Sequence, residues 1–191
     1  KKPLGRGGAK LKFHILAEAT TILPALTRYA AAPKNLKTIS DMYDIKMNLP
    51  AGWQKESEVY EDESGEMISH LEAHQYDNGL KADLAMMDIY IGAMPEDTTA
   101  EDQAFSNYAD MVGFSEDDPE DFEPVEKFKF NGRNAFGFSA LCENDAPMRF
   151  ISVEMKKGVL AIICIAAVDE KALADVFQLV ERNLRIAQRE A

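Results

Sequence analysis

The sequence contains few residues of the types that carry common enzyme chemistry. In 191 residues there are two cysteines, three histidines and one tryptophan. The sequence has no Gly-x-Ser-x-Gly nucleophile elbow, no P-loop and no Gly-x-Gly-x-x-Gly dinucleotide motif. Acidic pairs are numerous, but 33 Asp and Glu residues produce such pairs by chance. These observations favour a non-enzymatic protein.

Basic residues and long apolar runs are also scarce. The 21 Lys and Arg residues are outnumbered by the acidic ones, which gives a formal net charge of −12. Because nucleic acids and anionic membranes are polyanions, an acidic surface argues against both as partners. No run approaches the roughly 18 apolar residues that a membrane-spanning helix needs. We therefore expect a protein or peptide partner, with no nucleic acid and no membrane span.

The two cysteines fall in apolar, strand-like segments. Cys164 lies within a fully apolar run and Cys142 lies at the end of a neighbouring strand pattern. We interpret both as small buried hydrophobic residues rather than as a disulfide, which would need non-adjacent strands to approach unusually closely. They decide little about the compartment, and a cytoplasmic location is slightly favoured over a periplasmic or secreted one.

The N-terminal segment differs in composition from the rest. Residues 1–12 are basic, and residues 13–32 have the outline of a signal-peptide core. Four residues interrupt that core: His14, Glu18, Pro24 and Arg28. We therefore interpret residues 11–31 as an amphipathic helix, bent or broken at Pro24, that packs against the main domain or a partner. This predicts an N-terminal appendage over 1–36 and a single domain over 37–191.

The last third has the clearest pattern. It contains four strand-like segments, at 127–130, 134–142, 148–155 and 159–168. The connections between them are short, which is typical of antiparallel hairpins. Residues 159–168 are apolar at both alternating sets of positions, so this strand must be covered on both sides.

Two helices are predicted beside these strands. After the N-cap Asp169, apolar residues recur at helical spacing: Leu173, Val176, Phe177, Val180 and Leu184. A second helix is expected over 99–112, capped by Thr99, with Phe105, Tyr108 and Met111 or Val112 buried. Helices are thus available for both faces of one sheet. The predicted fold class is α+β, an antiparallel β-sheet flanked by helices in an α/β/α sandwich.

The first half of the main domain is less sharply patterned. An initial strand is expected over 39–49, followed by a turn at Pro50-Ala51-Gly52-Trp53. Two further strands, at 67–76 and 84–93, are joined through Asn78-Gly79. Acidic runs at 61–66 and 116–121 are interpreted as solvated loops, because neither has the ligand spacing of an EF-hand calcium site.

The initial strand is followed by a Leu-Pro-x-Gly-Trp turn at Leu49 to Trp53. This turn and the order of the predicted elements resemble the Mog1/PsbP-like fold, which includes the DcrB and DUF1795 proteins. The resemblance covers about residues 39–186. It implies an antiparallel sheet flanked by helices and a role in binding, since members are similar to Ran-binding factors, photosystem II extrinsic subunits, bacterial envelope lipoproteins and secretion effector chaperones. It implies no site residues, because these functions share no transferable residue set.

The strongest chemical motif is His70-Leu71-Glu72-Ala73-His74. On a strand, His70, Glu72 and His74 would project from one face, where two imidazoles and a carboxylate could bind zinc or another divalent ion. The spacing is not that of a helical zinc protease, and a solvated polar sheet face is the simpler interpretation.

Two functional hypotheses follow, and a third concerns assembly. The first is a non-enzymatic protein- or peptide-binding module, chaperone- or adaptor-like, that uses a sheet face or the groove between sheet and helices. Its candidate contact residues are Trp53, Met86, Met87 and Met94, although all four also suit a core. The alternative is a metal-dependent or small-ligand protein centred on His70, Glu72 and His74. The third possibility is a homodimer that exchanges residues 11–31 between subunits.

Overall fold

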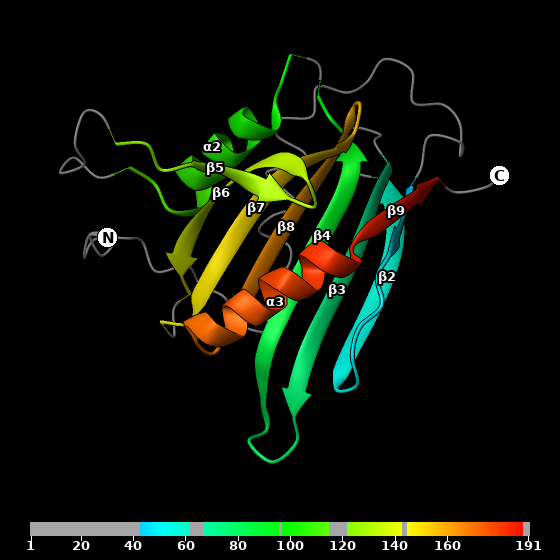
Figure 1. Ribbon diagram of the computed structural model, residues 1–191, viewed down its shortest axis with the longest axis vertical. Helices are drawn as coiled ribbons and strands as arrows, with labels where there is room; N and C mark the ends of the chain where they lie inside the picture. The colour runs from blue at the N-terminus through cyan, green and yellow to red at the C-terminus, as the bar shows by residue number, and fades with distance from the viewer. Residues whose placement is uncertain (1–42, 62–66, 96, 115–121, 143–144, 189–191) are drawn as a thin grey trace.

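The computed structural model describes residues 43–61, 67–95, 97–114, 122–142 and 145–188. Within these residues, seven strands form one antiparallel sheet, which Figure 1 shows. The strands are β2 (Trp53–Glu61), β3 (Met67–Asp77), β4 (Ala82–Ala93), β5 (Glu126–Phe130), β6 (Arg133–Leu141), β7 (Pro147–Lys156) and β8 (Val159–Ala167). Their order in the sheet is β2-β3-β4-β8-β7-β6-β5. The predicted four-strand meander is confirmed, because β5 to β8 are neighbours in chain order.

The central strand β8 is buried along its whole length. Its odd-numbered side chains, from Val159 to Ala167, belong to one apolar core, and its even-numbered side chains, from Leu160 to Ala166, belong to a second. The prediction that this strand is covered on both sides is confirmed. Including Val168 was wrong, because this residue lies just past the strand and is 54% exposed.

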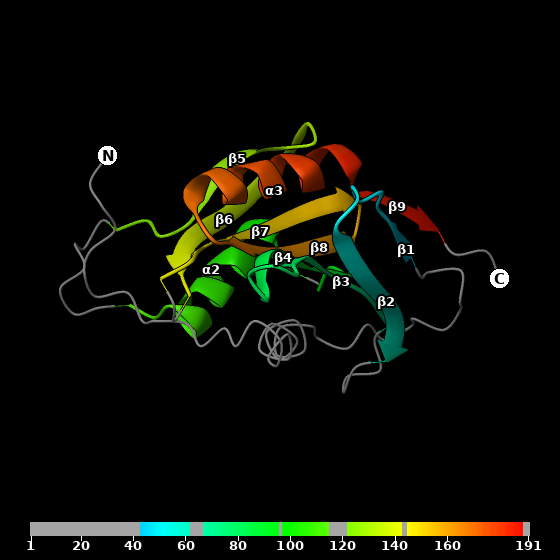
Figure 2. The same ribbon diagram turned by 90° about the horizontal axis from the view of Figure 1, so that it is seen from below.

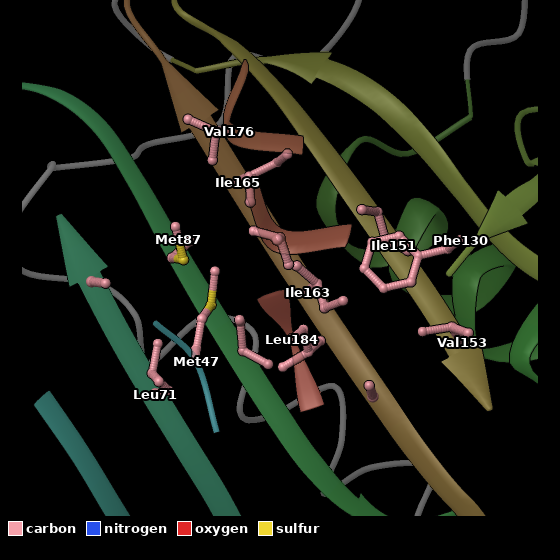
Figure 3. Packing of buried hydrophobic residues seen from close by; sticks show 14 of the residues in the cluster. Met47, Leu71, Met87, Phe130, Ile151, Val153, Ile163, Ile165, Val176 and Leu184 are labelled. Atoms are coloured by element: carbon pink, nitrogen blue, oxygen red, sulfur yellow. The ribbon is translucent and has the colours of Figure 1, made fainter. Parts of the chain in front are cut away.

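Helix α3 (Glu170–Asn183) covers the first of these cores, and we call that side of the sheet the α3 face (Figures 2 and 3). The Asp169 carboxylate caps the helix by accepting a hydrogen bond of 2.7 Å from the Ala172 N–H, as predicted. The helical residues Leu173, Val176 and Val180 are buried against the sheet. A short sheet of β1 (Tyr43–Lys46) and β9 (Arg185–Gln188) extends this layer.

Helix α2 (Ala100–Met111) lies on the opposite side, the α2 face, where it contacts β6 and β7 (Figure 2). Its N-terminus forms the capping box that Thr99 and Asp102 make possible. The prediction that Phe105 is buried was wrong, because the buried stripe follows Ala100, Ala104 and Tyr108 at i, i+4 and i+8. Phe105 lies about 100° around the helix from Ala104 and is 48% exposed.

The predicted α+β class is confirmed by this antiparallel sheet and its two helices. The strand expected over 39–49 is shorter than predicted, since residues 47–49 are not strand and 39–42 lie outside the described residues. The strands β2 and β9 had not been predicted. The expected helix over 11–31, the acidic run at 116–121 and residues 62–66 also lie outside the described residues. No described helix is long and apolar enough to cross a membrane.

Candidate functional site

The predicted His-Glu-His motif lies on β3, and its three polar side chains share the α2 face. Leu71 and Ala73 point the other way, into the α3-face core, as the alternation of a strand requires. Across the ladder, His70 is opposite Glu58 of β2 and Tyr90 of β4. The next pairs along β3 bring Glu72 opposite Glu56 and Asp88.

His70 is held between two carboxylates. Its Nε2 lies 3.1 Å from Oδ1 of Asp88, and its Nδ1 lies 3.4 Å from Oε1 of Glu58. The imidazole also stacks on the ring of Tyr90, with centroids 4.4 Å apart. Burial lowers the pKa of His70, but the hydrogen bonds and negative charges of Asp88 and Glu58 outweigh burial and leave this pKa raised. The site therefore favours the imidazolium form.

Asp88 is the most deeply buried acidic residue on this face. It is fully buried, and while Oδ1 meets His70, its Oδ2 has no hydrogen-bond partner among the described residues. An unpartnered carboxylate oxygen in a protein interior costs free energy, because water no longer solvates it. Asp88 therefore lowers the stability of the fold, as buried polar groups at functional positions often do.

Glu72 lies among both carboxylates and imidazoles on the α2 face. Burial, then the carboxylates of Asp88 and Glu56, raise the pKa of Glu72, although His70 and His74 act in the opposite direction. We call the four residues on neighbouring strands the acidic patch: Glu56, Glu58, Glu72 and Asp88. Burial is the main cause of the raised pKa of Glu72, and the Asp88 carboxylate adds to it.

The second histidine of the motif is directed to another carboxylate. His74 Nδ1 lies 3.3 Å from Oδ1 of Asp83, although these two atoms do not meet in hydrogen-bond geometry. His70 and His74 are therefore directed to different acidic partners. Within the part of the chain that the structure describes, no group of three or more His, Cys, Asp or Glu side chains is arranged to hold a metal ion. The divalent-metal site at His70, Glu72 and His74 stays a prediction.

The structure places the four candidate contact residues apart. Met87 is fully buried in the α3-face core, while Met86 is buried on the α2 face. Met94 is partly buried at the margin of the α2-face core, and Trp53 packs against the α3-face core. These residues do not form one shared surface.

Both cysteines are free and buried in the α2-face core, as the sequence analysis expected. Burial raises the pKa of Cys142 to about 11, and it raises the pKa of Cys164 well above the ordinary value. A thiol is nucleophilic only as the thiolate, so neither side chain is activated for attack at neutral pH.

The α2 face also has an aromatic surface that the sequence analysis missed. Phe105 and Phe114 are 48% and 52% exposed, and their ring centroids lie 5.4 Å apart. Tyr108 contacts Phe114 at 5.4 Å and the core residue Phe138 at 5.3 Å, so the exposed pair is anchored on the core. The sequence analysis had placed Phe105 in the buried stripe. The spacing of Ala100, Ala104 and Tyr108 at i, i+4 and i+8 is the signal that could have placed the buried face on the alanine side.

Comparisons with known proteins give this chain no relative. No family model, no curated protein and no solved structure matches it.

Proposed function

We propose that this protein is a non-enzymatic module that binds a protein or peptide partner, in the manner of a chaperone or adaptor. The observation that carries this proposal is the ring pair of Phe105 and Phe114, which is half exposed and anchored through Tyr108. Exposed aromatic rings that lie side by side are typical of binding surfaces, because a partner that covers them removes apolar area from water.

Charge around the ring pair defines the partner further. Helix α2 has exposed acidic residues at Glu101, Asp102 and Asp110 and has no basic residue. A partner segment with an apolar side chain flanked by Lys or Arg would match both the rings and the charges. We therefore propose an apolar and basic peptide segment as the ligand class.

We further propose that the fold is an α/β/α sandwich of the Mog1/PsbP-like type. The order of elements supports this: a short first strand, the turn before Trp53, a sheet interrupted by α2, and α3 near the C-terminal end, followed by β9. Proteins of that fold type are used mainly for binding, which agrees with the proposed function. Fold alone is a weak argument for function, so the exposed ring pair carries the proposal.

Selection of binders from a random peptide library by the full-length protein tests this function. We expect selected peptides to be enriched in aromatic or aliphatic residues next to Lys or Arg. Phe105→Ala and Phe114→Ala should each weaken binding of a selected peptide by about tenfold or more, because truncation of an aromatic hot spot costs about 2 kcal/mol or more.

Leu80→Ala is the matched control. Leu80 is 71% exposed but lies in the β3–β4 hairpin, outside the aromatic surface. Its truncation should leave peptide affinity unchanged. If all three variants bound the selected peptides as the native protein does, the Phe105 and Phe114 surface would have no role in binding and the proposal would fail.

A further inference from the structure

Strand β2 forms one edge of the seven-stranded sheet and, with nine residues, is long for an edge strand (Figure 1). All nine residues pair with β3 without a register shift, and six of them are exposed. Its other side pairs with no strand among the described residues. A long, regular edge presents backbone N–H and C=O groups to which another strand can add.

The charges on β2 differ between its two sides. On the α2 face, the exposed residues Glu56 and Glu58 are separated by one residue, the spacing of neighbours on one side of a strand. The single basic residue of β2, Lys55, points to the other side and donates a hydrogen bond of 3.0 Å to the Met47 carbonyl. β2 has no basic residue on the side of the two glutamates, although His70 of β3 pairs with Glu58 at 3.4 Å.

The acidic patch continues inward from this edge. Glu72 lies next to Glu56, and Asp88 follows on β4, fully buried and with Oδ2 unpartnered among the described residues. The opposite edge is different in both length and charge, since β5 has five residues and includes Lys127 and Lys129. The long acidic edge is thus a feature of β2 and not of both sheet margins.

We propose that the outer edge of β2 is a docking site for an extended basic segment of a partner protein. The segment adds to the sheet as a further strand through backbone hydrogen bonds with β2. Lys or Arg side chains at alternate positions then lie beside Glu56 and Glu58. This goes beyond the proposed function, because the Phe105 and Phe114 surface belongs to α2, which packs on β6 and β7.

The test is a fluorescence anisotropy titration of the full-length protein with a labelled peptide of alternating Thr and Lys. We expect saturable binding that weakens as salt is added. Glu56→Gln/Glu58→Gln should lower the affinity by about tenfold, because two cross-strand charge pairs are lost. A peptide with N-methyl groups on alternate residues should bind much more weakly, since it cannot complete the backbone ladder.

Two further measurements distinguish strand addition from general attraction of charges. Glu170→Gln/Asp175→Asn removes two exposed acidic charges on α3, and this matched variant should bind the peptide as the native protein does. Peptide binding should also slow amide hydrogen exchange in β2 but not in β5.

Several results would overturn the docking site. These are no saturable binding, equal binding of the N-methylated peptide, or an equal loss in the α3 variant. Salt-sensitive self-association that Glu56→Gln/Glu58→Gln abolishes would assign the edge to a second copy of the chain instead. Because none of these variants alters Phe105 or Phe114, the edge site and the aromatic surface can fail separately.

Discussion

The two faces of the seven-stranded sheet differ in what their interiors contain. The α3-face core consists of hydrophobic side chains, such as Leu71, Met87 and Ile163 (Figure 3). Ser69 is also buried on this face, but its hydroxyl donates a hydrogen bond to the Tyr43 carbonyl. The α2 face contains a comparable apolar core but also buries polar groups, among them His70, Asp88 and Ser152. The α3 face therefore stabilises the fold mainly through burial of apolar side chains. The α2 face also contains polar side chains whose burial lowers stability.

Unpartnered atoms sharpen this difference. Among the described residues, Asp88 Oδ2, Ser152 Oγ and both polar atoms of the Gln103 side-chain amide are buried without a hydrogen-bond partner. Each belongs to the α2 side, on a sheet strand or on α2 itself. Buried polar groups that lack partners are expected mainly where function demands them. Functional groups are therefore expected on the α2 face.

The largest effect is expected for Asp88→Ala. In this variant, Glu58 is the only carboxylate left beside the buried His70 side chain, and the Glu58 side chain is 66% exposed. Loss of one member of a buried pair costs about 3–5 kcal/mol. The double variant His70→Leu/Asp88→Leu should cost much less, because no buried charge is left uncompensated. Urea denaturation of both variants measures the difference. Equal losses would mean that the pair itself stabilises the fold.

Ile163→Ala should cost about 2–5 kcal/mol on the other face, because Ile163 is fully buried in the α3-face core. Val168→Ala is the control in the same segment, and we expect a change within about 0.5 kcal/mol for this exposed position. Chemical denaturation gives both values. A large loss for Val168→Ala would contradict the assigned end of β8.

Thr99→Ala should destabilise the protein by about 1 kcal/mol. The Thr99 hydroxyl accepts a hydrogen bond of 3.1 Å from the Asp102 N–H, and the Asp102 carboxylate accepts one of 2.9 Å from the Thr99 N–H. Thr99→Ser keeps the hydroxyl and should restore most of the stability. If Thr99→Ser were as unstable as Thr99→Ala, the capping hydrogen bond would not be the cause.

The smallest effect is a dependence of stability on pH. The raised pKa of His70 means that the folded state binds its proton more tightly than the unfolded state. This contribution is fully present below the unfolded pKa of about 6.5 and is lost as pH rises through the folded pKa. The raised pKa of Glu72 also lowers stability as pH rises, because the folded state holds the Glu72 proton more tightly than the unfolded state does. This loss begins at the ordinary carboxyl pKa and is complete above the raised one.

Thermal unfolding between about pH 5 and pH 9 checks this prediction. The native protein should lose stability across the upper part of that range. His70→Leu/Asp88→Leu should show a smaller loss, because the histidine proton is no longer linked to folding. A double variant with the same pH profile as the native protein would contradict the assignment to His70.

The sequence by itself determined the elements whose patterns are local. Continuous apolar character predicted β8, because a strand buried on both sides is apolar at every position. The change to helical spacing after Asp169 predicted α3, because a helix buried along one stripe has apolar residues every three or four positions. The β3–β4 hairpin followed from Asn78 and Gly79 in the same way. The shared face of His70, Glu72 and His74 also followed from strand alternation alone.

Only the tertiary structure decided what those residues contact. It joined His70 to Asp88 and Glu58 through strand pairing, and it placed β8 between β4 and β7. It revealed β2, whose exposed polar residues give no apolar alternation, and left Phe105 and Phe114 exposed. The physical reason is that strand pairing and helix docking depend on contacts between residues far apart in the chain, which periodicity along the sequence does not record.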